Sequence, residues 1–141
     1  MSLRLPAGSI TVLLGPSVER RRLMNRLDDA TGRGSDGRGA VVRRLGARVA
    51  DGLADRMRTV ATARSEPTGM VLADRLTDGL DASGRRCVLG ALREVAASGV
   101  AVLVDDVDPV AALAIADGAL RVDERGGIHP EGVSEPAYLA S

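Results

Sequence analysis

Short apolar runs alternate with amphipathic segments along the chain, a pattern typical of strands that alternate with helices. Four apolar runs predict strands, at 9–14, 70–73, 100–104 and 119–122. Four segments with the apolar spacing of helices lie among them, at 18–29, 51–64, 82–98 and 109–116. The runs at 70–73 and 100–104 have no polar member, which is typical of strands buried on both faces of a parallel sheet. The alternation therefore predicts an α/β fold with a mostly parallel sheet flanked by helices.

The remaining segments predict connections. Residues 39–49 predict a short hairpin that turns near Gly46. The loop at 31–39 spells Gly32-x-Gly34-x-x-Gly37, but a helix precedes it and a strand follows, the reverse of a dinucleotide-binding turn. We therefore interpret it as a flexible connection. One domain is expected over 1–128, with a loose tail at 129–141.

Composition narrows the classes of function. The chain has 141 residues, 19 basic and 19 acidic, so it has no basic excess for a nucleic-acid surface. It has one Tyr and no Phe or Trp, so only Tyr138 could stack on a base. The single cysteine, Cys87, fits a reducing compartment, and its place on the apolar side of a helix predicts a packed thiol. No run is long enough to span a membrane, and no leader pattern opens the chain, so we expect a cytoplasmic protein.

The stretch around Asp74 carries the clearest motif. Residues 74–81 read Asp-Arg-Leu-Thr-Asp-Gly-Leu-Asp after an apolar strand. They resemble the Walker B and D-loop segment of ATP-binding-cassette (ABC) ATPases, Asp-Glu-Pro-Thr-Ser-Gly-Leu-Asp. The resemblance implies a P-loop NTPase-like fold and places Asp74 at the magnesium-side aspartate. Arg75 replaces the catalytic glutamate of the family, and a protonated guanidinium has no lone pair with which to act as a base.

The turn after the first strand is similar to the family's phosphate loop, G-x-x-x-x-G-K-[ST]. Gly15 and Ser17 lie in the turn, Arg21 takes the lysine position and Arg22 takes the Ser/Thr position, so these four are the candidate nucleotide-binding residues. Arg20 stands where a glycine lets the backbone approach the ligand. Val18 replaces another glycine, and Glu19 adds a negative charge where phosphate would lie.

Two further family motifs are altered. Residues 99–119 align with the family's switch strand and helix; Asp108 matches the aspartate of the His-Asp pair, and Val107 replaces the histidine that contacts the γ-phosphate. Residues 53–58 are the nearest match to the signature segment and lack its glycines. The segment between the phosphate loop and Asp74 is too short for the family's helical subdomain and Gln loop, and the N-terminal strand with a base-stacking aromatic has no counterpart. These differences imply a truncated form of the family fold.

The carboxylates after the strands permit a second interpretation. Asp74, Asp105, Asp106 and Asp108 are expected at or beyond the carboxyl ends of neighbouring strands, where they could hold Mg²⁺ for phosphoryl chemistry. The simpler interpretation makes Asp108 a helix cap, leaves Asp105 and Asp106 solvated, and pairs Asp74 with an arginine such as Arg21. The simpler interpretation is favoured.

Three hypotheses follow. The leading one is a catalytically silent ABC ATPase-like domain that acts as a binding or regulatory subunit and needs no cofactor. By resemblance, its partner is an ABC ATPase or transporter subunit or a second copy of the chain, and it meets a membrane only through that partner. The alternative is an ATP-binding or Mg²⁺-dependent phosphohydrolase that uses Asp74 and the carboxylates at 105–108. A decayed copy with no present role is the third.

Overall fold

A computed structural model describes residues 5–29, 41–65 and 68–132. The strands are β1 (Ile10–Leu14), β2 (Val42–Gly46), β3 (Met70–Asp74), β4 (Ala101–Asp105), β5 (Gly118–Val122) and β6 (Ile128–Gly132). The helices are α1 (Ser17–Asp29), α2 (Leu53–Ser65), α3 (Ala82–Ala97) and α4 (Pro109–Leu113). The predicted alternation of strands and helices is confirmed.

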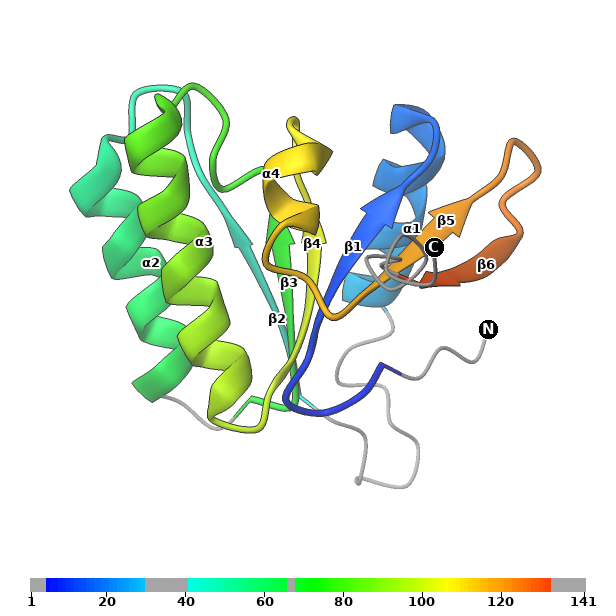
Figure 1. The fold of residues 1–141 in the computed structure, drawn as a ribbon, viewed down its shortest axis with the longest axis horizontal. Helices are drawn as coiled ribbons and strands as arrows, with labels where there is room; N and C mark the ends of the chain where they lie inside the picture. The colour runs from blue at the N-terminus through cyan, green and yellow to red at the C-terminus, as the bar shows by residue number, and fades with distance from the viewer. Residues whose placement is uncertain (1–4, 30–40, 66–67, 133–141) are drawn as a thin grey trace, which may run out of the picture.

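The strands form one six-stranded sheet in the order β2-β3-β4-β1-β5-β6 (Figure 1). The first five strands are parallel, and β6 runs antiparallel to β5. The predicted mostly parallel sheet is confirmed, with β3, β4 and β1 side by side in one direction. Because parallel strands share a carboxyl edge, the loops that follow them gather at one end of the sheet.

Helices cover both faces of the sheet, and strand alternation decides which side chains meet them. Ile10 and Val12 of β1 pack with residues of α2, α3 and α4 in one cluster, whereas Leu13 packs with Leu23 and Met24 of α1 in the other. Figure 1 shows α1 behind the sheet and the other helices in front of it. Each fully buried aliphatic side chain stabilises the fold by about 2 kcal/mol, so both faces contribute.

The helix that follows the Asp74 motif has a regular start and end. Asp81 is the N-cap of α3, and its carboxylate accepts a hydrogen bond from the Gly84 amide at 2.7 Å. Gly99 follows the helix with φ of 104°, a conformation that glycine adopts readily and that ends a helix. This loop and helix therefore keep the local geometry that the motif implies.

Some expectations were wrong. Segment 41–49 forms no hairpin, because β2 pairs in parallel with β3 and leads into α2. Cys87 is exposed rather than packed, because it lies outside the buried stripe of α3. Residues 129–132 belong to β6, so the ordered domain extends beyond residue 128. Helix α4 ends at Leu113, earlier than expected. The Gly-rich loop at 31–39 and the tail beyond residue 132 lie outside the described residues.

Candidate functional site

The candidate residues lie at the carboxyl edge of the sheet, as the sequence predicts. Asp74 ends β3 and Asp105 ends β4, and these two residues are partners in the parallel register. Gly15 follows β1, which pairs with the other side of β4. The turn after β1 and the two aspartates therefore adjoin one another.

The turn after β1 passes directly into α1. Gly15 has φ of 119°, and a Cβ atom there would lie 2.2 Å from the carbonyl oxygen of Val122, so the position needs glycine. α1 begins at Ser17, and the amide of Arg20 donates to the Pro16 carbonyl at 2.9 Å. A phosphate-wrapping loop needs a run of free amides. The helix therefore takes up the Arg20 amide, which is not available to a ligand in this turn.

Arg20 ties the turn to β4. Its Nε donates to the Gly15 carbonyl at 3.0 Å, and its Nη1 forms an ion pair with the Asp105 carboxylate. Asp105 is 3% exposed, not solvated as the simpler interpretation held. Burial raises the pKa of Asp105, the positive charge of Arg20 opposes that rise, and the charge of Asp74 adds to it. Arg20 is therefore the counter-ion that makes this buried carboxylate tolerable.

The Asp74 carboxylate forms an ion pair with an arginine from the neighbouring strand. Arg44 of β2 reaches its Oδ2 with Nη2 at 3.0 Å and with Nε at 3.1 Å. Arg44 also bonds to Asp28 and Asn25 of α1, at 3.3 Å and 2.8 Å. Burial opposes the charge on Arg44, but the hydrogen bonds and charges of Asp74 and Asp28 outweigh it and raise the arginine's pKa. Asp74 thus has an arginine partner as expected, but the partner is Arg44 rather than Arg21.

Arg75 has an unusual backbone. Its φ is 56°, the left-handed region, where no other non-glycine residue of the described segments lies. Its amide donates to the Asp105 carbonyl at 2.8 Å, which fixes the chain as it leaves β3. A left-handed conformation costs a residue with a Cβ atom about 1 kcal/mol or more. The position that the resemblance assigns to the catalytic glutamate is therefore held in place at a cost.

The carboxylates after β4 are used inside the protein. Asp106 is 3% exposed; it accepts from the Thr77 hydroxyl at 2.8 Å and from the Asp108 amide at 2.8 Å, so it too is not solvated. Asp108 is the N-cap of α4, as predicted, and accepts from the Val110 amide at 3.2 Å. Among the described residues, no group of three acidic, histidine or cysteine side chains could hold a metal ion. The arrangement does not favour a magnesium site at Asp74 and residues 105–108.

The remaining candidates of the turn do not converge on one point. Arg22 turns to Glu19 of its own helix, at 3.0 Å, and its side chain is 67% exposed. Ser17 is exposed at the start of α1. Val107 is 44% exposed at the position of the family histidine. Arg21 lies against a cavity together with Asp74 and Arg75, whereas Arg22 and Gly15 line two other hollows.

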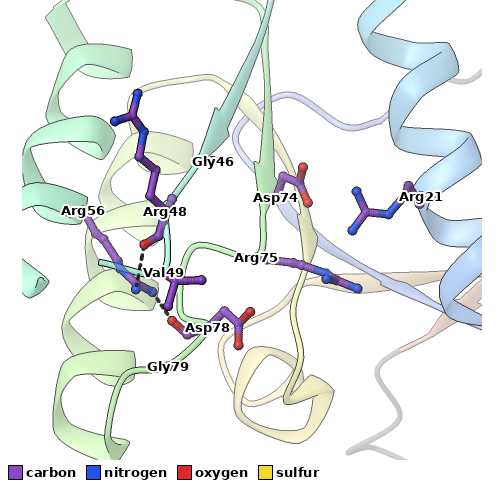
Figure 2. Close-up of a pocket in the computed structure, with 10 residues that line it drawn as sticks. Arg21, Gly46, Arg48, Val49, Arg56, Asp74, Arg75, Asp78 and Gly79 are labelled. Carbon is purple, nitrogen blue, oxygen red and sulfur yellow. Dashed lines mark hydrogen bonds between the residues drawn. The ribbon is translucent and has the colours of Figure 1, made fainter. Parts of the chain in front are cut away.

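That cavity is a pocket of about 300 Å³ between the loops that follow β2 and β3, shown in Figure 2. We call it the arginine pocket. Its lining residues are Arg21, Gly46, Ala47, Arg48, Val49, Arg56, Asp74, Arg75, Asp78 and Gly79. Arginines outnumber aspartates in this wall, so the pocket favours negative charge.

No protein-family model and no curated protein sequence matches the chain. Solved structures do. An ATP-binding subunit of an ABC transporter superposes with a TM-score of 0.57 at 11% identity, over 84% of this chain and 76% of that one. A metal-chelate type ABC transporter in an inward-facing conformation superposes with a TM-score of 0.61 at 13% identity. The match covers 94% of this chain and 75% of that one. An RNase-L inhibitor gives 0.67 at 14%, over 96% of this chain and 37% of that one. This chain has an ABC ATPase-like fold.

The ABC ATPase-like fold lets the fit to nucleotide be judged residue by residue. Arg20 bonds to Gly15 and Asp105 across the turn that the resemblance places at the phosphate loop. Arg44 occupies Asp74, the expected magnesium-side aspartate. The residues present therefore do not fit MgATP in the family's manner. No helix in the described segments has the length and apolar character needed to cross a bilayer.

Two arginines of this site are not among the candidate residues that the sequence motifs indicate. Arg56 is 2% exposed on α2, and Arg44 bridges Asp74 to α1. A signal for Arg56 was present, because position 56 shares a helical face with Leu53 and Val60. No comparable signal marks Arg44, whose role depends on the pairing of β2 with β3.

Proposed function

We propose that this chain is a catalytically silent ABC ATPase-like domain that acts by binding another protein. It neither holds MgATP in a phosphate loop nor activates water for hydrolysis. The proposal unites an ABC ATPase-like fold with changed chemistry at the positions where the family binds nucleotide. ATP and Mg²⁺ are accordingly not expected as its cofactors.

The observation that carries the proposal is the position of Arg20. Its guanidinium lies on the Gly15 carbonyl and the Asp105 carboxylate, at the turn where a phosphate would be wrapped. A ligand entering this turn would have to displace Arg20 and leave Asp105, 3% exposed, without its counter-ion. Uncovering such a buried charge costs several kcal/mol, so nucleotide binding is opposed from within.

The position of Arg75 supports loss of hydrolysis independently. A general base must accept a proton from water, and a guanidinium stays protonated. Among the described residues, no histidine lies at the switch position either, because Val107 stands there. The two groups on which the family's water attack depends are both replaced.

The kind of partner follows from the fold. Two solved structures with a similar fold are an ATP-binding subunit of an ABC transporter and an inward-facing ABC transporter. We therefore expect the partner to be an ABC ATPase or transporter subunit, or a second copy of this chain. The protein would reach a membrane only through that partner, in the cytoplasm. Val107 and Val110, 44% and 75% exposed, offer apolar contacts beside α4.

Calorimetric titration with MgATP tests the proposal. We expect no binding tighter than about millimolar and no phosphate release above the protein-free rate. Mg²⁺ alone, in a parallel titration, is expected to give no heat of binding. One-to-one micromolar binding of MgATP that disappears in Asp74→Ala would contradict the proposal and favour the phosphohydrolase hypothesis.

A further inference from the structure

The arginine pocket contains two arginine side chains, Arg21 and Arg75, and the charge of Arg75 also opposes the rise in the pKa of the buried Asp105. Arg21 of α1 and Arg75 of the loop after β3 both line it. Figure 2 shows the two side chains extending into the same space from opposite sides. In the described part of the chain, neither guanidinium has a hydrogen bond or ion pair. Two free guanidinium groups facing one cavity form a fork suited to an oxyanion with several oxygens.

A third arginine adds charge from the wall of the pocket. Arg56 is 2% exposed and donates to the carbonyl oxygens of Leu76 at 3.1 Å and Asp51 at 3.1 Å. It also bonds to the carbonyl oxygens of Asp78 and Arg48, as Figure 2 shows for those two. No carboxylate pairs with it within the described segments. Carbonyl dipoles satisfy its donors but leave its full positive charge beside the cavity.

Arg56 also makes the wall rigid. Its four carbonyl partners belong to the loop that follows β2 and the loop that follows β3. One buried side chain therefore holds the two sides of the pocket together before any ligand arrives. A preformed site loses less conformational entropy on binding, which favours affinity.

The carboxylates of the pocket do not cancel this charge. Asp74 is already engaged by Arg44 at 3.0 Å, from outside the pocket lining. Asp78 is exposed and is the remaining carboxylate of the lining. Arg48 lines the pocket too, but Figure 2 shows its guanidinium pointing away from Arg75. The charge that faces the cavity is therefore mainly that of Arg21, Arg75 and the buried Arg56.

The strain at Arg75 indicates that its position has a use. A left-handed φ of 56° is unfavourable for arginine and would suit glycine. The hydrogen bond from the Arg75 backbone amide to the Asp105 carbonyl, at 2.8 Å, holds Arg75 in this conformation. The result is that the guanidinium lies against the cavity, opposite Arg21.

We infer that the arginine pocket binds a compact multivalent oxyanion, a small phosphate or dicarboxylate compound, through Arg21 and Arg75. A cavity of about 300 Å³ admits such a ligand. A nucleoside gains little there, because Phe and Trp are absent from the chain and none of the described residues that line the cavity is aromatic. The inference goes beyond the proposed function and would give the silent domain a ligand of its own.

Calorimetry on the full chain without added metal tests the inference, with pyrophosphate, inorganic phosphate and succinate in separate titrations. We expect pyrophosphate or succinate to bind one-to-one, and the stronger of the two identifies the ligand class. Arg21→Gln and Arg75→Gln should each weaken binding by about tenfold or more. Arg86→Gln is the matched control, since it removes an equal charge from an exposed position outside the pocket.

A stability measurement separates a binding role from a folding role. Arg75→Gly removes the left-handed strain, so it should raise Tm while weakening anion binding as much as Arg75→Gln does. Absence of binding by all three anions would overturn the inference and leave the proposed function standing. Equal weakening by Arg86→Gln would also overturn it, since attraction would then be non-specific. Tight MgATP binding lost in Asp74→Ala would contradict only the proposed function.

Discussion

Single arginines take over the positions where an ABC ATPase-like fold would meet its nucleotide. Arg20 neutralises Asp105, Arg44 neutralises Asp74, and Arg75 stands at the position of the catalytic glutamate. Two of the three make internal ion pairs, so they contribute to folding. We therefore expect substitutions of Arg20 and Arg44 to lower the free energy of unfolding.

We expect Arg20→Leu to lower the free energy of unfolding by about 3 kcal/mol at about pH 7, because it leaves the buried Asp105 unpaired. Burial already raises the pKa of Asp105, and loss of Arg20 would raise it further. A raised carboxyl pKa means that the native state takes up a proton before the unfolded state as pH falls, so the deficit should shrink toward about pH 4.5. Urea unfolding at both pH values measures it.

Arg22→Leu serves as the control for that experiment, because the Arg22 side chain is 67% exposed and its ion pair among the described residues is with Glu19 of the same helix. Its effect should stay within about 0.5 kcal/mol. A deficit for Arg20→Leu that is independent of pH would contradict the role assigned to Asp105.

Arg56→Met should destabilise the protein by about 3 kcal/mol, since several carbonyl oxygens beside a buried position lose their donor. Arg58→Met, on the same helix but 74% exposed, is the matched control and should change Tm little. Thermal unfolding followed by circular dichroism measures both. Equal Tm values for the two variants would show that Arg56 does not hold the loops.

At the scale of elements, the loop and helix after β3 keep their geometry although the chemistry beside them changed. Asp81 caps α3, and Thr77 donates to the buried Asp106 after β4. The Thr77–Asp106 contact joins the loops after β3 and β4 and needs no bound nucleotide. The motif is thus retained where it serves packing.

Asp81→Ala should cost about 1 kcal/mol, because the Gly84 amide at the first turn of α3 loses its acceptor at 2.7 Å. Asp81→Asn keeps a capping oxygen and should lose at most a few tenths of a kcal/mol. Urea midpoints for the two variants test the cap. A loss as large in the asparagine variant would assign the effect to the charge instead.

At the scale of the whole molecule, one sheet carries two apolar layers. Leu23 of α1 and Leu92 of α3 are both buried, on opposite faces of the sheet. Because β1, β3 and β4 supply side chains to both layers, the layers should unfold together.

Leu23→Ala and Leu92→Ala should each lower stability by about 3 kcal/mol in a single transition with an unchanged denaturant slope. Circular dichroism and the hydrogen exchange of amides on both faces measure this. The control is Leu53→Ala, at 36% exposure, which should cost much less. Two separate transitions in either core variant would contradict a single cooperative domain.

Sequence patterns predict the mostly parallel sheet with its flanking helices and the cap at Asp108, because these depend on local periodicity and short motifs. The pairing of Arg44 with Asp74 could not be read from the chain, since it depends on which strand lies beside β3. Likewise, the short run with a glycine at residues 39–49 predicts a hairpin from local sequence alone. The strand that β2 pairs with is β3, which comes later in the chain. Long-range pairing decides both cases.

The contact between Arg20 and Asp105 has an evolutionary consequence. A glycine at position 20 would reopen the turn toward a phosphate but would strand the aspartate beneath it. That single change would weaken the fold before any phosphate binding could compensate. A sequence that carries this ion pair therefore gains phosphate binding at the turn only if positions 20 and 105 change together.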